Sequence, residues 1–453
     1  MNDASPDARA TSTVSHGRAR VLRAHVLHVP RDPFEIGPQA LEAWSDGAVA
    51  IDEAGHVVDL GAASEVLARQ PRLPLVDARD AILLPGLVDA HVHYPQVGVI
   101  GALGLPLLPW LAQRTFPHEA RFADLELARR EASAFVRLLL ANGTTSALVF
   151  GAHFAPATEA LFEAAAEAGL RLTTGLVVAD RLVPEALRTT PDEAYDASLR
   201  LAARWHRRGR LRYALTPRFA PACSDELLAA CGAAARERPE LIVTSHLNES
   251  PAEIAQVRRS FPRDGDYLAV YERHGLVRPG AVYAHDLHPS DDELARLAAA
   301  GAAVAHCPSS NAFLGSGAFP LRRHRRAGVT VAFGTDVGAG TSLSLLHEGL
   351  QAYLTQMGLA EAGEPLAAPH VLWLATRAGA DAIGMGEQVG DLRPGRAADL
   401  VLLRPRPTST LAAALRHADS AEAVLAACLT LAREDAVAET WVQGEVVHPH
   451  RAA

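Results

Sequence analysis

Short apolar segments alternate along most of the chain with longer segments in which apolar residues recur every three or four positions. Eight apolar runs follow residue 80, and they span residues 81–93, 144–150, 171–178, 211–218, 241–249, 281–286, 302–308 and 330–336. The segments between them, for example 124–141 and 156–169, have the spacing of amphipathic helices. Runs that are apolar throughout are typical of parallel strands, because helices cover both faces of such a sheet. Eight strand and helix units predict an α/β fold, a (β/α)8 TIM barrel.

The two ends of the chain show a different pattern, in which short apolar and polar runs alternate. Residues 48–60 contain two apolar runs around a glycine-containing turn, and Gly444 lies at the centre of a second such pair. Both patterns are typical of β-hairpins. We therefore expect residues 18–80 and 390–449 to pair into one small, discontinuous β-sandwich domain, with the barrel occupying residues 81–389.

Composition narrows the function classes further. The 453 residues are 49% hydrophobic and 21% charged, as in an ordinary soluble globular protein. The net charge is -9 and no basic stripe occurs, which argues against nucleic acid or a membrane surface as a partner. Residues 1–20 lack the apolar core of a signal peptide, and the four cysteines are scattered. These features predict a reduced, cytoplasmic protein.

The chain contains no lysine, so all 43 basic residues are arginine. A phosphate-binding P-loop, a pyridoxal Schiff base and a metal bridge through a carbamylated lysine each require a lysine side chain. Those three chemistries are excluded.

Five side chains with metal-binding chemistry lie at the ends of predicted strands. His91 and His93 end the first strand, and on a strand such a pair shares one face. His246 ends the fifth, His285 the sixth and Asp336 the eighth. Any one of them alone is more often a core or surface residue, and Asp336 alone could cap a helix. All five at the carboxyl ends of barrel strands predict a site for zinc or ferrous iron.

A carboxyl group follows the fifth strand directly. Glu249 lies three residues after His246, where it could carry a proton between a metal-activated water and a ring nitrogen. His285, beside the metal, could orient that water or share its proton. The pattern predicts hydrolytic chemistry.

These motifs resemble the amidohydrolase superfamily, and within it the guanine deaminase family. The resemblance covers about residues 21–447 and rests on several segments: His91 to Gln96, Trp110 with 115–117, 217–219, His246 to Glu249, 306–317 and 334–342. It implies an amidohydrolase-type barrel with one metal ion per chain, zinc or possibly iron. The implied metal ligands are His91, His93, His246 and Asp336. The implied catalytic residues are Glu249, His285 and Asp336.

The resemblance further implies guanine as the substrate, hydrolysed to xanthine and ammonia in purine catabolism by a cytoplasmic homodimer. The implied substrate contacts are Gln96, Trp110, Arg218, Phe219, His246 and Glu249. Chemistry supports two of them, because an arginine fork matches the adjacent acceptors O6 and N7 of guanine, and a phenyl ring offers a stacking face. Arg218 could instead form a structural salt bridge, and Phe219 could be core packing.

Two alternatives remain open at this point. Another aminohydrolase of the superfamily, acting on a different purine, a pterin or a triazine, would have the same metal site. A metal-free scaffold protein would have no need of Glu249 beside a complete set of ligands. His153 and His306, which also end predicted strands, are interpreted as supporting or packing residues and not as metal ligands.

Overall fold

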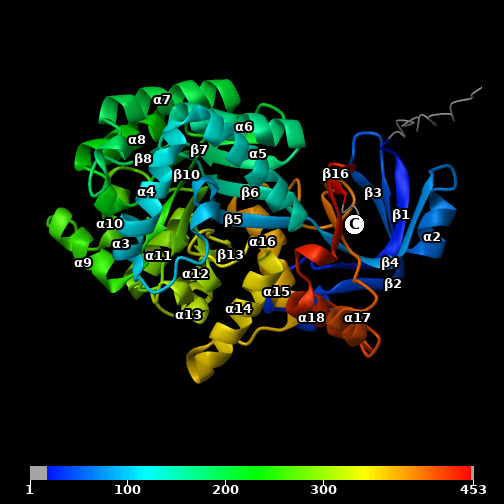
Figure 1. Ribbon diagram of the computed structural model, residues 1–453. Helices are drawn as coiled ribbons and strands as arrows, with labels where there is room; N and C mark the ends of the chain where they lie inside the picture. The colour runs from blue at the N-terminus through cyan, green and yellow to red at the C-terminus, as the bar shows by residue number, and fades with distance from the viewer. Residues whose placement is uncertain (1–17, 450–453) are drawn as a thin grey trace, which may run out of the picture.

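The computed structural model describes residues 18–449 and contains two sheets (Figure 1). The larger sheet is parallel, in the order β13-β12-β11-β10-β9-β7-β6-β5, with β8 also paired to β9. Its strands are β5 (Leu87–His93), β6 (Thr144–Phe150), β7 (Arg171–Gly175), β8 (Val177–Val178), β9 (Leu211–Pro217), β10 (Ile242–Leu247), β11 (Ala281–His285), β12 (Ala303–His306) and β13 (Thr330–Phe333). The predicted TIM-type barrel is confirmed.

Backbone hydrogen bonds join the two edges of this sheet. The amide of Asp336 donates to the carbonyl of His91 at 2.8 Å, and the amide of His93 donates to the carbonyl of Val337 at 3.2 Å. The segment after β13 therefore closes the barrel against β5. This closure brings residues 245 positions apart in sequence to the same rim, which is the carboxyl end of the strands.

Helices surround the barrel, as Figure 1 shows. The longer ones are α5 (Leu125–Ala141), α6 (Ala155–Ala168), α7 (Pro191–Trp205), α8 (Asp225–Glu237), α9 (Pro251–Ser260), α11 (Asp291–Ala300), α14 (Leu345–Gly358) and α15 (Ala368–Ala375). The shorter ones are α10 (Tyr267–Arg273), α12 (Pro308–Phe313), α13 (Leu321–Ala327) and α16 (Arg377–Ala382). In α5 the Asp124 side chain caps the first turn, and Ala128, Ala132, Phe135 and Leu139 form the buried face.

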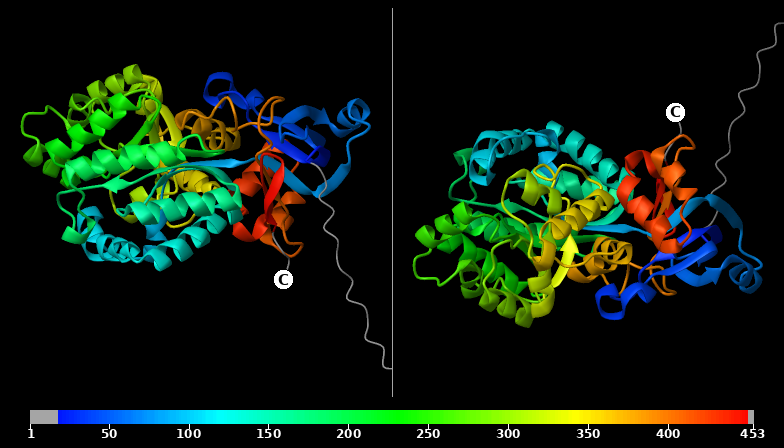
Figure 2. Two further views of the ribbon diagram at one scale, coloured as in Figure 1. Left: turned by 90° about the horizontal axis from the view of Figure 1, so that it is seen from above. Right: turned by 90° about the horizontal axis from the view of Figure 1, so that it is seen from below.

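The second sheet draws strands from both ends of the chain, in the order β16-β15-β14-β4-β1-β2-β3. Its strands are β1 (Arg20–His28), β2 (Glu42–Ile51), β3 (Val57–Ala62), β4 (Leu75–Pro85), β14 (Leu400–Leu403), β15 (Val437–Val442) and β16 (Glu445–Pro449). The helices α1 (Pro33–Ile36), α2 (Ala63–Arg69), α17 (Thr410–Leu415) and α18 (Ala421–Leu431) belong to the same chain ends. Figure 2 shows these segments together beside the barrel.

One predicted strand is wrong in its extent. Residues 81–93 form two strands in different sheets, because β4 ends at Pro85 and β5 begins at Leu87. A side chain at Gly86 would place its Cβ 2.2 Å from Thr145 Oγ1, so only glycine fits at this junction. The division into residues 18–80 with 390–449 and residues 81–389 stays a proposal, and β4 crosses its first boundary.

The main apolar core lies between the barrel strands and the surrounding helices, and includes Phe135, Phe162, Trp205 and Tyr283. Between residues 18 and 449, no helix combines the length and the apolarity that crossing a bilayer requires. The expectation about a signal peptide concerns residues 1–20, most of which lie outside the described part of the chain.

Candidate active site and metal centre

The five predicted strand-end side chains meet at one end of the barrel. His91 and His93 come from β5, His246 from β10, His285 from β11, and Asp336 follows β13. All of them are buried, with relative exposures between 0% and 9%. His285 and Asp336 have positive φ angles of 76° and 48°, which are uncommon outside glycine and gather at functional sites.

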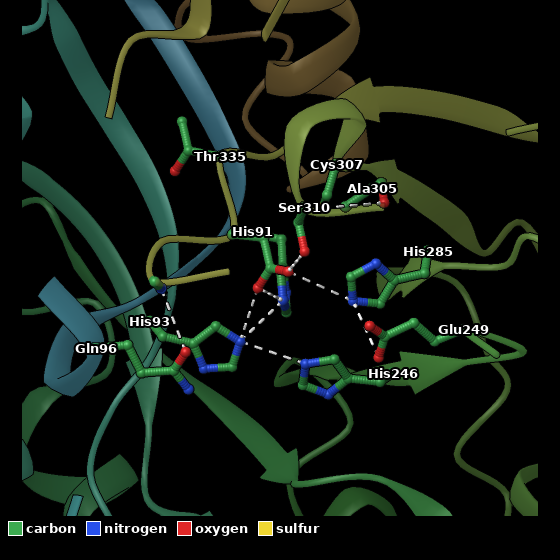
Figure 3. A network of polar contacts seen from close by, with 12 residues as sticks. His91, His93, Gln96, His246, Glu249, His285, Ala305, Cys307, Ser310 and Thr335 are labelled. Atoms are coloured by element: carbon green, nitrogen blue, oxygen red, sulfur yellow. Dashed lines mark hydrogen bonds and ion pairs between the residues drawn. The ribbon is translucent and has the colours of Figure 1, made fainter. Parts of the chain in front are cut away.

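Ligand atoms of four of these residues converge on a single point (Figure 3). His93 Nε2 lies 3.1 Å from His91 Nε2 and 3.3 Å from His246 Nε2. Asp336 Oδ1 lies 3.2 Å from His91 Nε2 and 3.1 Å from His93 Nε2. The four ligand atoms all lie within 4.8 Å of one another. His285 stands beside this group, with its Nε2 3.7 Å from Asp336 Oδ2.

The hydrogen bond of His246 tests whether this group suits a cation. Its Nδ1 lies 2.6 Å from the carbonyl oxygen of Arg218, and a carbonyl only accepts, so Nδ1 carries the proton. Nε2 therefore directs a lone pair into the cluster, as in a metal-bound imidazole. Burial also lowers the pKa of His93 to about 4, which keeps that ring neutral. Three imidazoles and a carboxylate fit a divalent transition metal.

A buried polar layer, which the sequence did not reveal, supports Asp336. Ser310 Oγ donates to Asp336 Oδ2 at 2.6 Å. Asp89, on β5, accepts from the Thr335 hydroxyl at 2.5 Å and from the Thr335 amide at 3.1 Å. Burial raises the pKa of Asp89 to about 6. Ser310 and Thr335 lie in the segments 306–317 and 334–342 that carry the resemblance, but their types gave them no role there, and Asp89 was marked only by its place two residues before His91.

Glu249 lies beside the cluster as expected, with Oε2 3.6 Å from His285 Nε2. Burial, reinforced by the neighbouring carboxylate of Glu253, raises the pKa of Glu249 well above its usual range. His285 is fixed from the other side, because its Nδ1 lies 2.9 Å from Asn311 Oδ1. Burial lowers the pKa of His285 to about 4. The site thus holds a carboxyl group and a neutral imidazole in contact, which suits proton transfer.

A small cavity of about 30 Å³ lies over these groups. Its lining contains His93, Gln96, Leu107, Trp110, Leu111, Arg218, Phe219, His246, Glu249, His285, Leu314, Asp336 and Ala339. Every residue implied to contact the substrate is in this set. Leu107 and Leu111, on either side of Trp110, belong to short helical turns that no motif indicated.

The arginine of the cavity is buried and already paired. Arg218 follows β9 and donates through Nη1 to Glu119 Oε2 at 2.7 Å. The same Nη1 lies 3.0 Å from His153 Nε2. Glu119 was missed, because it ends the short helix α4 (Phe116–Glu119) and not a strand.

His153 and His306 both lie outside the donor cluster, and His306 stacks on Phe319 with ring centres 4.2 Å apart.

The fold and the donor cluster define a class of hydrolase, and comparison with known families agrees. A model of the amidohydrolase family matches residues 82–447. The chain belongs to the amidohydrolase family, as the motifs predicted.

Within that family, several of the proteins it is similar to are guanine deaminases. The chain is 51% identical over 437 residues to the probable guanine deaminase of Deinococcus radiodurans, over 96% of this chain and 99% of the relative. Identity to the guanine deaminase of Escherichia coli is 40% over 374 residues, or 82% and 84% of the two chains. The solved structure of the Escherichia coli guanine deaminase superposes with a TM-score of 0.91 at 37% identity, covering 95% of this chain and all of that one.

Proposed function

We propose that this protein is a guanine aminohydrolase, which converts guanine and water to xanthine and ammonia. The observation that carries the proposal is the composition of one cavity. Its lining combines the donor residues His93, His246 and Asp336 and the carboxyl group of Glu249 with a second group, Arg218, Phe219 and Gln96. The first group suits hydrolysis, and the second suits a planar ligand with adjacent acceptors. The similarity to a probable guanine deaminase and to a guanine deaminase, reported above, supports the same activity.

The metal ligands in this proposal are His91, His93, His246 and Asp336. A divalent ion held by these residues would supply a Lewis acid that makes water acidic enough to act as the nucleophile near neutral pH. The proposed ion is zinc, one per chain, with ferrous iron as the other outcome of metal analysis. Since all basic residues are arginine, a second ion bridged by a carbamylated lysine plays no part.

In the proposed complex, Arg218 donates to O6 and N7 of guanine, and Phe219 stacks on the ring. Gln96 and Trp110 complete the enclosure, and both are buried with 2% exposure. A site built to donate to O6 leaves its donors unpaired when adenine enters, because adenine has an amino group there. This mismatch is the proposed basis of selectivity.

The protein's own residues then move the protons. His285 and Asp336 take the proton of the attacking water, whose oxygen bonds to the ring carbon that bears the exocyclic amine. Glu249 protonates the adjacent ring nitrogen and then helps to transfer a proton to the amine. The carbon–nitrogen bond breaks, ammonia leaves and xanthine remains. The raised pKa of Glu249 suits a group that must hold a proton near neutral pH.

Ultraviolet absorbance of the metal-loaded protein mixed with guanine tests this function, with adenine and cytosine measured in parallel. We expect conversion of guanine only, and a loss of about 100- to 10,000-fold in kcat for Glu249→Gln, the usual contribution of general acid–base catalysis. Glu387→Gln changes a surface glutamate and should leave the rate unaltered. An inactive wild-type protein with one metal per chain would refute guanine as substrate and direct the search to pterins and triazines.

Three further parts of the proposal concern the cellular context. The family resemblance supports a homodimer and a role in purine catabolism. The four cysteines, all free and buried, support a reduced cytoplasmic setting. Light scattering of the purified protein tests the dimer.

A further inference from the structure

A single buried carboxylate holds both of the polar residues proposed to contact guanine. Glu119 exposes only 3% of its surface. Its Oε1 accepts a hydrogen bond from Gln96 Nε2 at 2.8 Å, and its Oε2 accepts one from Arg218 Nη1 at 2.7 Å. Glu119 is absent from the cavity lining, so it acts on a ligand only through these two neighbours.

The contacts of Gln96 determine which way its side-chain amide points. Its Nε2 faces a carboxylate, which at neutral pH can only accept a hydrogen bond. Its Oε1 accepts from the amide of Gly338 at 3.3 Å, and an amide N–H can only donate. The reverse orientation would place two donors together and two acceptors together. Glu119 and Gly338 therefore leave one N–H and one oxygen lone pair of Gln96 in a defined arrangement.

The contacts of Arg218 restrain its guanidinium group in a similar way. Nη1 donates to Glu119 and lies within hydrogen-bond distance of His153 Nε2, which must accept, since arginine only donates. The guanidinium carbon lies 4.9 Å from the centre of the Phe116 ring. Because Nη1 is already engaged, the other guanidinium N–H groups remain for a ligand in the cavity.

The charge of Glu119 also balances that of Arg218. Burial by itself would raise the pKa of Glu119, but the charge of the adjacent Arg218 outweighs burial and holds that pKa well below its usual range. The carboxylate stays ionised, so this side of the cavity has no uncompensated positive charge. A neutral ligand can therefore bind there without bringing a counter-charge.

We propose that Glu119 is a positioning residue that determines specificity, because it orients Gln96 and Arg218 for the 6-oxo edge of the purine. This inference rests on the proposed function. A residue in this role affects how tightly and how selectively the ring binds, and has little effect on the chemical step. A merely structural ion pair would affect folding stability and leave selectivity unchanged.

The test compares Glu119→Gln with the full-length, metal-loaded wild-type protein. The variant keeps the size of the side chain, loses the charge and adds a donor that can face Gln96 or Arg218. We expect KM for guanine to rise about 10- to 100-fold, as for other residues that orient a binding group, with kcat changing less than about threefold. Metal content should be unchanged.

Calorimetric titration with hypoxanthine gives a second measurement that does not depend on turnover. Hypoxanthine keeps the 6-oxo group of guanine and lacks the amine that is hydrolysed. The Kd for hypoxanthine should rise about 10- to 100-fold in Glu119→Gln, as for KM. The ratio of the Kd for adenine to the Kd for hypoxanthine should fall at least about tenfold, because an amide that is not oriented can pair with the 6-oxo edge or with the 6-amino edge.

Asp399→Asn is the matched control. Asp399 is also a buried carboxylate paired with an arginine, because its Oδ2 accepts from Arg171 Nε at 2.8 Å. This pair lies far from the cavity, where β7 begins and the chain enters β14. Its loss should lower thermal stability without altering KM or ligand preference.

Two outcomes separate this inference from the proposed function. If the wild-type protein leaves guanine unchanged, the proposed function is wrong. If it converts guanine and Glu119→Gln loses stability as Asp399→Asn does, with KM and Kd as in the wild type, the role of Glu119 is overturned. Should Glu119→Gln not fold, Glu119→Asp is the alternative variant, because it keeps the charge and shortens the side chain by one methylene. Unchanged binding in that variant would equally overturn the role.

Discussion

The two sides of the cavity differ in whether their charged and polar groups find partners within the chain. The histidine side, formed by His91, His93, His246 and Asp336, gathers lone pairs within 4.8 Å of one another. The arginine side pairs its cation internally, because Arg218 lies 2.7 Å from Glu119. The first side therefore needs a cation from outside, and the second is complete within the chain. The difference separates a centre for chemistry from a surface for recognition.

Two buried glutamates show what causes this difference. Glu348, on α14, accepts from the Ser309 amide at 2.9 Å, and burial raises its pKa to about 8. Glu119 is equally buried, yet its pKa is lowered because Arg218 outweighs the effect of burial. Burial opposes ionisation in both, and only a paired arginine reverses the direction. Glu348, in its neutral form, supports the loop beside the donor cluster. Glu119 supports the arginine side as an anion.

Asp336→Asn should have the largest effect on the histidine side. The substitution turns the carboxylate, whose Oδ1 lies within 3.2 Å of His91 Nε2 and His93 Nε2, into a neutral amide. We expect kcat to fall by about 1,000-fold or more, because both the metal ligand and a proton acceptor are lost. Elemental analysis should show less than one metal per chain. Full metal content with normal turnover would contradict the assignment of this side.

Arg218→Met should act on the other side of the comparison. It leaves Glu119 buried without its cation, and it removes the proposed donor to O6. We expect KM for guanine to rise about 100-fold, in the range for breaking a buried charged pair, while metal content stays at the wild-type value. Steady-state kinetics with elemental analysis measures both. If the variant loses its metal, the two sides are not independent and the comparison fails.

Glu348→Gln should produce the smallest effect, visible in the pH dependence of stability. Between the ordinary carboxyl pKa near 4.5 and the raised pKa of about 8, the folded protein holds a proton that the unfolded chain has released. The free energy of unfolding therefore falls as pH rises through this window, by at most about 1.4 kcal/mol per pH unit from this residue. The stabilisation is fully present below pH 4.5.

The variant stays neutral at every pH, so its unfolding free energy should fall less steeply than that of the wild type. Urea unfolding between pH 5 and pH 8.5 measures both slopes. Asp89 and Glu253, whose pKa values are raised to about 6 and about 7, contribute in the same direction to both proteins. Identical slopes would mean that Glu348 is ionised in the fold.

Sequence patterns were most informative where the chain is regular. The runs at residues 144–150 and 281–286 match β6 and β11 almost residue for residue. Parallel strands in a barrel place their carboxyl ends on one rim, so residues at those ends could be grouped without a structure. His246 and His285 were expected on that rim for this reason, and the structure places them there. The break at Gly86 was not predictable, because it depends on the approach of Thr145.

The sequence by itself determined the barrel, the strand-end histidines and the exclusion of lysine chemistry. The barrel follows from local periodicity and the exclusion of lysine chemistry from composition. The grouping of the histidines follows because parallel barrel strands place their carboxyl ends on one rim. Only the tertiary structure revealed the supporting side chains Asp89, Ser310 and Glu119. Glu119 lies in a connection between barrel strands, and nothing in its neighbours along the chain indicates that it will meet both Gln96 and Arg218. Such contacts depend on the path of a loop, and the ionisation of a buried group depends on the charges that this path brings beside it.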